Sequence, residues 1–440
     1  MITRDAFDTL ADALLAEAQG GEVLLLGYYA EDTDFARLNR ARLRQAGHVA
    51  QRELHVELID GARHASADIQ LQDDAQADLA QARAELASLR ELLPQLPEDP
   101  YLAYAAEVRP SESVADGELG TREAWLDAIA ASAGDLDLVG LLARGVQAHG
   151  FANSLGQRNW HAAASFNFDW SLHAAGGRAV KSRYAGSRWN PEQLTARVAA
   201  ARRRLDALAR PTQTPATGHH RAFLAPAALG ELLDLLGWGG FGLKSLRTGQ
   251  SPLQRLADGR DALHPAVKLR EARAGSPAPG FSEAGYLLPA EVSLVEGGRF
   301  GSALAGPRSA REFGVDVNAR MEAPEALEMD GGDLAEADVL ATLGDGLYLS
   351  DLWYCNYSDR NACRITGMSR YACFAVAGGE LAGPLAPMRF DASIYDLLGD
   401  GLQALTRERE RLADASTYER RSTATQQLPG ILVDGFPLTL

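Results

Sequence analysis

The pattern of apolar positions in the first half of the chain predicts helices that alternate with strands. Apolar residues three or four apart share one face of a helix, whereas apolar residues two apart share one face of a strand. Helices are expected at 3–18, 34–45, 78–93, 121–133 and 192–208, and the segment 34–45 is basic. Strands are expected at 23–29, 54–58, 65–71, 136–148, 162–172 and 178–184. The two runs that flank Gly61 predict a hairpin.

The clearest alternation runs from Ala162 to Leu172 and predicts a long strand with one buried face. The later segment Pro211–Thr217 is rich in proline and threonine, which favours a domain boundary there. Beyond it, strands are expected at 222–224, 344–354, 371–377 and 431–436, and helices at 227–238 and 394–412. The sequence therefore predicts an α+β fold, with an N-terminal helix-and-antiparallel-sheet domain at 1–210 and a β-rich C-terminal domain at 218–440.

Length and charge narrow the classes of function. A chain of 440 residues exceeds the size at which one hydrophobic core usually stops growing, so two domains are expected. The net charge of -16 repels a phosphate backbone, and no basic stripe with interleaved aromatic residues offsets it, which disfavours nucleic-acid binding. No charged leader precedes an apolar run and no 18 consecutive residues are apolar, so we expect a cytoplasmic protein without membrane contact.

Three cysteines, Cys355, Cys363 and Cys373, are too far apart in sequence for a zinc ribbon or a redox pair. Free cysteine is among the most buried residue types. Reduced, structural thiols are therefore expected.

The segment Ala222–Leu243 reads AFLAPAALGELLDLLGWGGFGL and resembles the strand and helix of the TldD/PmbA family, whose catalytic members carry HExxxH at this place. Matching GELL to the residues before that motif puts its first histidine at Asp234, its glutamate at Leu235 and its second histidine at Gly239. A zinc peptidase needs imidazoles to hold the ion and a carboxylate to take a proton from its water. We therefore expect no metal site and no catalytic residue in this degenerate motif.

Six further segments resemble the same family, in the order that the family shows them. They are DTDFARLNR at 32–40, ANSLG at 152–156, PEALE at 324–328, GDGLYLSDLW at 344–353, TGMSRYA at 366–372 and GGELAGP at 378–384. The resemblance implies a TldE/PmbA-type subunit that pairs with an HExxxH-bearing TldD-like subunit to form a peptidase for unfolded peptides. It also implies zinc in the partner subunit and no cofactor in this chain.

Two groups of residues are candidates for peptide binding or a subunit interface. Asn153 and Ser154 occupy a predicted turn that, in the family, lies near the active chamber. Trp353, Tyr354 and Arg360 gather near the end of a predicted strand, and aromatic and arginine residues supply much of the energy of interfaces. A core aromatic pair beside a solvated loop explains the second group equally well.

Two other functions remain open at this point. The chain could be a stand-alone peptide-binding or assembly protein, for example a homodimer. It could also be a metal-independent hydrolase with a cysteine or serine nucleophile, if the fold brings a histidine close to it. A neighbouring gene that encodes HExxxH would favour the partner subunit, and activity in the presence of a chelator would favour the hydrolase.

Overall fold

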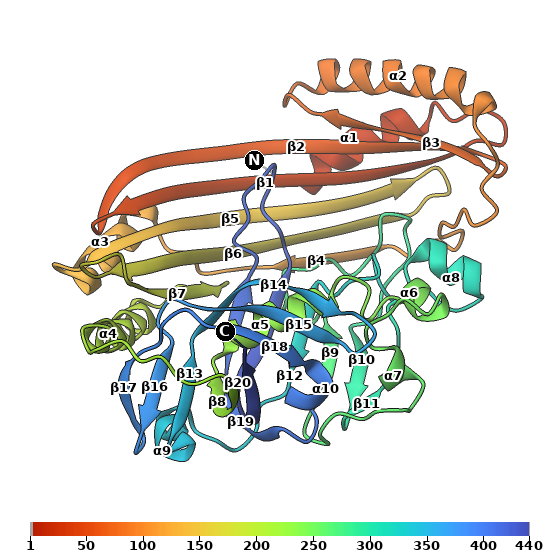
Figure 1. The fold of residues 1–440 in the computed structure, drawn as a ribbon. Helices are drawn as coiled ribbons and strands as arrows, with labels where there is room; N and C mark the ends of the chain where they lie inside the picture. The colour runs from red at the N-terminus through yellow and green to blue at the C-terminus, as the bar shows by residue number, and fades with distance from the viewer. Residues whose placement is uncertain (1–2, 440) are drawn as a thin grey trace.

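Two large sheets organise the computed structural model, which describes residues 3–439. The first sheet has the order β3-β2-β1-β5-β6-β4, with β7 also paired to β6 (Figure 1). Its strands are β1 (Val23–Asn39), β2 (Arg42–Asp60), β3 (Arg63–Gln70), β4 (Ser111–Ala115), β5 (Asp137–Asn153), β6 (Arg158–His173) and β7 (Ala179–Gly186). We call it the N-terminal sheet. All its pairs are antiparallel except β4 with β6.

One face of the N-terminal sheet is apolar and is covered by helices. These helices are α1 (Arg4–Leu15), α2 (Ala75–Leu92) with the short η1 (Leu93–Gln95), α3 (Arg122–Ala133) and α4 (Pro191–Ala207). Trp160 of β6 packs with Phe7 of α1, and Phe166 packs with Trp125 of α3. Even-numbered residues of β6 thus face the helices, as the alternation in the sequence predicts.

The second sheet has thirteen strands and forms the core of the C-terminal half. They are β8 (Gly218–Leu224), β9 (Leu269–Ala272), β10 (Glu291–Glu296), β11 (Arg299–Phe300), β12 (Ala326–Met329), β13 (Gly346–Leu349), β14 (Asp351–Asp359), β15 (Arg364–Arg370), β16 (Phe374–Ala377), β17 (Glu380–Pro384), β18 (Arg389–Ser393), β19 (Leu402–Ala413) and β20 (Thr425–Leu438). Its helices are α5 (Pro226–Leu236), α6 (Leu243–Arg247), α7 (Gln254–Ala257), α8 (Pro307–Phe313), η2 (Glu336–Asp338), α9 (Val339–Leu343) and α10 (Ile394–Leu397).

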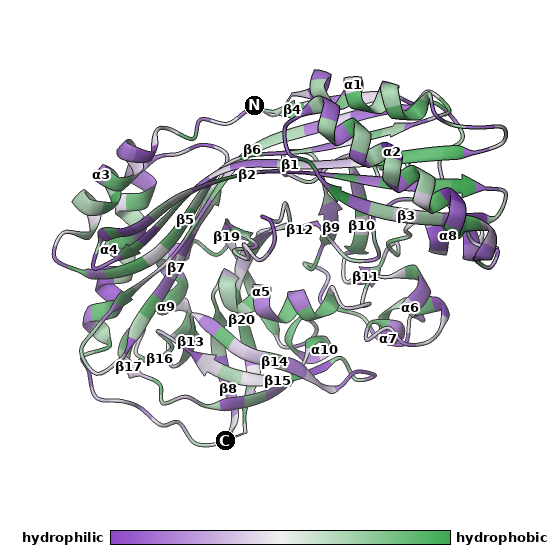
Figure 2. Cartoon of the chain, turned by 90° about the horizontal axis from the view of Figure 1, so that it is seen from above, coloured by the Kyte–Doolittle hydropathy of each residue, from purple (hydrophilic) through white to green (hydrophobic). Residues whose placement is uncertain are grey.

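The N-terminal sheet arches over the C-terminal half, and the hydrophilic loop after β19 lies in the space between them (Figure 2). The two halves also share a core, because Phe374 of β16 packs in the same cluster as Trp170 of β6. The α+β prediction is confirmed. The predicted boundary at 211–217 stays a prediction; this segment joins α4 to β8.

The predicted basic helix at 34–45 is wrong. This segment forms the end of β1, a tight turn and the start of β2. Arg40 and Ala41 make the turn with φ of 52° and 53°, the left-handed values that a two-residue hairpin requires. Local helix propensity is outweighed here because β1 is paired on both edges, with β2 and with β5, which satisfies its backbone hydrogen bonds.

The predicted helix at 394–412 is also wrong beyond its first turn. Helix α10 ends at Leu397, a turn that contains Gly399 and Gly401 follows, and residues 402–413 form β19. Pairing with β20 buries Leu402 and Leu405 in the core. The helices expected at 3–18, 78–93, 121–133, 192–208 and 227–238 are present with ends shifted by a few residues. Among residues 3–439 no helix is long and apolar enough to cross a membrane.

Candidate functional site

The helix on which the sequence resemblance places the degenerate motif, α5, lies between the C-terminal core and a cleft of about 550 Å³. Pro226 at its first turn fits a position where no backbone donor is needed. Seven of its residues, mostly leucines, are buried, and they fix the helix against the sheet. Its polar face, with Glu231 and Asp234, lines the cleft.

Asp234 is the one polar side chain among the three motif positions. Its carboxylate accepts a hydrogen bond from the side-chain amide of Gln426 on β20. Burial raises the pKa of Asp234 to about 6, and the carboxylates of Glu231 and Asp414 act in the same direction. The group therefore changes charge near neutral pH inside the cleft.

The other two motif positions cannot contribute to a metal site. Leu235 is buried in the core, and its carbonyl accepts a hydrogen bond of 2.8 Å from the Tyr357 hydroxyl. Gly239 lies beyond the end of α5 with φ of 82°, and a Cβ there would stand 2.6 Å from Oγ of Ser245. The residues at these positions therefore do not fit a zinc site, and no group of three or more ligating side chains is gathered elsewhere in residues 3–439.

A charge cluster joins the two halves beside α5. Arg183 of β7 lies 3.3 Å from Asp351 of β14, 3.5 Å from Asp169 of β6 and 3.7 Å from Glu231 of α5. Burial disfavours its charged form, but these carboxylates outweigh burial and raise the pKa of Arg183. Lys181 also contacts Asp169, at 3.6 Å. A partly buried guanidinium shared by three carboxylates ties β7 to α5 and β14.

The same arginine lies where two clefts meet. Arg183, Lys181 and Ala227 line both the α5 cleft and a second cleft of about 650 Å³ between α4 and the C-terminal sheet. The floor of the second cleft includes Phe223 and Tyr348, whose rings are 5.5 Å apart. Together the clefts present both apolar and charged side chains.

Trp353 and Tyr354 lie on β14, which is paired only with β15 within the described chain. They are 47% and 83% exposed, which is high for aromatic residues and leaves them free to contact another chain. The pairing of β14 with β15 is irregular between Trp353 and Asn356, and Tyr354 has φ of 57°. The bulge turns these side chains outward.

Arg360 has a different environment. Its guanidinium donates to the carbonyl of Gln250 at 2.8 Å and also to the carbonyl of Trp238, and it lies over the ring of Tyr357. These contacts hold the chain that follows α5. A role of Arg360 in assembly or peptide capture stays a prediction, and the contacts indicate that it would act by positioning the end of α5.

Asn153 and Ser154 form the turn between β5 and β6. The Asn153 side chain accepts hydrogen bonds from the backbone of Leu155 and Gln157, and Ser154 Oγ accepts one from Leu24. Along β6 this turn is separated from Asp169 by roughly 35 Å, at about 3.3 Å per residue. The structure therefore does not bring Asn153 and Ser154 to the charge cluster, and their role in peptide binding stays a prediction.

The cysteines are poorly placed for nucleophilic catalysis. Cys363 and Cys373 are buried and Cys355 is half-buried, all three with free thiols. Burial raises the pKa of both Cys355 and Cys363 to about 12, so the reactive thiolate is disfavoured at neutral pH.

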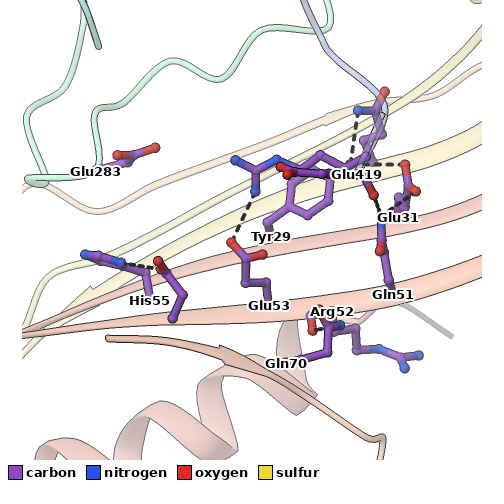
Figure 3. A network of polar contacts seen from close by, with 12 residues as sticks. Tyr29, Glu31, Gln51, Arg52, Glu53, His55, Gln70, Glu283 and Glu419 are labelled. Carbon is purple, nitrogen blue, oxygen red and sulfur yellow. Dashed lines mark hydrogen bonds and ion pairs between the residues drawn. The ribbon is translucent and has the colours of Figure 1, made fainter. Parts of the chain in front are cut away.

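One segment that joins the two halves was not singled out from the sequence. Residues 414–424, which we call the strap, connect β19 to β20 and contact the inner face of the N-terminal sheet (Figure 3). Where the strap contacts it, that face carries the polar side chains of Tyr29, Glu31 and Gln147. The polar residues at odd positions of β6, such as Ser165 and Asn167, were the feature of the sequence that could have indicated a polar partner on this face.

Comparison with known families decides the identity of the fold. Residues 217–439 match the family described as PmbA/TldA metallopeptidase C-terminal domain. The chain belongs to the PmbA/TldD family. This confirms the resemblance seen in the sequence, whereas no curated protein matches the chain.

Solved structures of the PmbA/TldD family share the whole fold. TldE from Thermococcus kodakarensis is 12% identical with a TM-score of 0.78, over 99% of this chain and 100% of that chain. A candidate modulator of DNA gyrase from Thermotoga maritima is 15% identical with a TM-score of 0.76, over 98% and 100%. Another from Bacteroides thetaiotaomicron is 14% identical with a TM-score of 0.75, over 100% of both chains. At these identities the similarity shows the fold alone.

Proposed function

We propose that this chain is a non-catalytic, TldE-like subunit that binds extended, unfolded peptide and forms a metallopeptidase with an HExxxH-bearing TldD-like chain in the cytoplasm. The observation that carries the proposal is the place of α5 at the cleft together with the residues that it presents there. The helix sits at the floor of a cleft, as a catalytic helix would, but presents Asp234, a buried Leu235 and a Gly239 outside the helix. The apolar and charged lining of the cleft suits an extended peptide, whereas these three positions lack the metal-binding imidazoles and the general base that cleavage requires.

The edge of β14 supports a role in assembly. An exposed strand edge can pair with an extended peptide or with a strand of another chain. Trp353 and Tyr354 on this strand are large, exposed aromatic residues, which are common among the residues that dominate binding energy. Both features are those expected of a subunit that depends on a partner.

Co-expression with an HExxxH-bearing family member from the same genome tests the proposal. We expect a stable complex, zinc only in the partner, and cleavage of an unstructured peptide that needs both chains and is abolished by a chelator. Size-exclusion chromatography, zinc content and cleavage should be measured for each chain and for the pair. Full activity of the HExxxH chain alone would contradict the proposal and favour a stand-alone binding protein, and chelator-resistant cleavage by this chain would favour a hydrolase.

Trp353→Ala should weaken complex formation by about tenfold or more, because truncation of a central aromatic residue commonly costs over 1 kcal/mol. Leu43→Ala is a matched control, because Leu43 is also 47% exposed but lies on β2 of the N-terminal sheet, away from the β14 edge. Equal effects of the two substitutions would show that the β14 edge is not the interface.

A further inference from the structure

The strap crosses the space between the two halves. Hydrogen bonds hold its base in the C-terminal half and its tip on the N-terminal sheet. Its base at Asp414, Ala415 and Ala424 lines the α5 cleft together with the adjoining ends of β19 and β20. The backbone N–H of Asp414 donates to the carbonyl of Ala424 at 3.1 Å, which closes the base like a hairpin. Its tip reaches β1, β2, β5 and β6 on the inner face of the N-terminal sheet (Figure 1).

Side chains of the sheet bind the main chain of the strap. Glu31 accepts from the N–H of Arg421 at 3.1 Å, and Gln147 donates to the carbonyl of the same residue at 2.9 Å. The Tyr29 hydroxyl lies 3.2 Å from that carbonyl, and Gln51 donates to the carbonyl of Glu419 at 2.9 Å (Figure 3). Contacts to backbone groups do not depend on the bound sequence, so this face can accept other extended segments.

Two adjacent arginines supply the side-chain contacts. Arg421 is only 5% exposed, and its Nη2 donates to Ser165 Oγ at 2.9 Å. Among residues 3–439 no carboxylate lies within ion-pair distance of its guanidinium. Arg420 lies 3.3 Å from Glu53 and 4.6 Å over the ring of Tyr29. One arginine is therefore held by neutral oxygens in a buried pocket and the next by a carboxylate and an aromatic face.

The inner face has more hydrogen-bonding capacity than the strap uses. Gln147 Oε1, His149 Nε2, His161 Nδ1 and Asn167 Nδ2 are buried and have no partner in the described part of the chain. Unused polar atoms are costly in a buried face that serves only packing. His161 is covered by Pro277, whose carbonyl lies 3.0 Å from its Nε2, so the atoms of Gln147, His149 and Asn167 are those that a bound polar chain would satisfy.

We infer that the inner face of the N-terminal sheet is a binding site for extended peptides with two consecutive basic residues, and that the strap is its internal occupant. A peptide that displaces the strap would take over its contacts to Tyr29, Glu31, Gln51 and Gln147. The net charge of -16 favours cationic ligands over acidic ones. The inference rests on the proposed peptide-binding role and specifies its ligand class.

Replacement of residues 415–423 by a short glycine–serine turn should open the site, because the hairpin base at Asp414 and Ala424 remains. Binding of labelled peptide STYERRST, which is the strap sequence 416–423, should be measured by fluorescence anisotropy for the opened and wild-type chains. The opened chain should bind about tenfold tighter than wild type and about tenfold tighter than it binds STYEAAST, since loss of charged hydrogen bonds costs about this much.

Glu31→Ala in the opened chain should abolish most of this binding. Glu283→Ala is the matched control, because Glu283 is a nearby carboxylate that pairs with Arg320 and not with the strap (Figure 3). A folded opened chain that binds both peptides equally, or no better than wild type, would overturn the inference. So would equal effects of the two substitutions.

Hydrogen exchange of the wild-type chain gives a second test that does not depend on folding of the variant. Excess STYERRST should speed exchange of strap amides, that of Arg421 above all, whereas STYEAAST should not. Unchanged strap exchange at saturating peptide would also overturn the inference. These tests use this chain alone, so failure to form a complex with an HExxxH chain would leave them intact, and failure here would leave complex formation untouched.

Discussion

At the scale of single residues, Asp234 shows most directly why α5 does not fit a metal site. A carboxylate that held zinc would be ionised. Here desolvation and two neighbouring carboxylates favour the neutral form instead, and among residues 3–439 the amide of Gln426 is the one hydrogen-bond partner of this carboxylate. The residue is therefore better suited to accept or share a proton than to hold a cation.

Asp234→Asn should stabilise the protein at pH 8 by about 1 kcal/mol, because a pKa raised to about 6 makes ionisation unfavourable in the folded state, whereas solvent screens much of this cost at the exposed side chain. The contribution of the protonated Asp234 carboxyl to the free energy of unfolding is complete below about pH 4 and is lost as the pH rises through about 6. The stabilisation by Asp234→Asn should therefore vanish at pH 4. Urea unfolding from pH 4 to pH 8 checks this. Asp316→Asn, at an exposed site, should change stability by less than about 0.5 kcal/mol.

At the scale of elements, α5 ends too early to carry the complete motif. Its last helical residue is Leu236, whereas a second histidine would have to stand at Gly239. Arg360 holds the segment after the helix through the carbonyl of Trp238. A zinc ligand at Gly239 would need a different path of the chain, not only a different side chain.

The triple substitution Asp234→His, Leu235→Glu and Gly239→His should therefore not create tight zinc binding. The left-handed φ at Gly239 and the contact with Ser245 should cost about 1–3 kcal/mol of stability. Gly239→Ala should show the same cost without any ligand, which makes it the matched control. Zinc content after dialysis against a chelator, together with denaturant unfolding, measures both effects. Stoichiometric zinc in the triple variant would show that the rest of a metal site is intact.

At the scale of the whole molecule, the two halves are joined by the shared core around Phe374, by the strap and by the Arg183 cluster. The cluster is the part most sensitive to a single change. Asp351 is 4% exposed, and burial raises its pKa to about 6 although Arg183 opposes this shift as a counter-charge. Removal of one partner of a buried pair leaves an uncompensated charge.

Arg183→Met should lower the free energy of unfolding at neutral pH by about 1–3 kcal/mol, because loss of the guanidinium raises the pKa of the Asp351 carboxyl further and protonation then limits the cost. The double variant Arg183→Met with Asp351→Asn should recover a large part of the loss, because no strong charge is then buried at that position. Guanidinium unfolding followed by tryptophan fluorescence compares the variants. An Arg183→Met chain as stable as wild type would show that the cluster does not hold the halves together.

The sequence by itself determined which faces of the strands and helices are apolar. Period-two alternation located β6 and the hairpin of β2 and β3, helical spacing located α1 to α5, and the absence of histidine and glutamate at 234, 235 and 239 followed from the residues alone. These features are local, because each depends on residues a few positions apart.

Only the tertiary structure decided what covers the polar faces. The hairpin of β1 and β2 overrides local helix propensity because strands β2 and β5 pair with both edges of β1. Arg421 meets Glu31 across 390 positions of sequence, and Arg183 meets Asp351 and Glu231 from another sheet. Alternation predicts that the odd residues of β6 are polar, but not that the strap buries them. Burial of a polar face depends on residues that are far away in sequence, and local sequence patterns do not predict such non-local contacts.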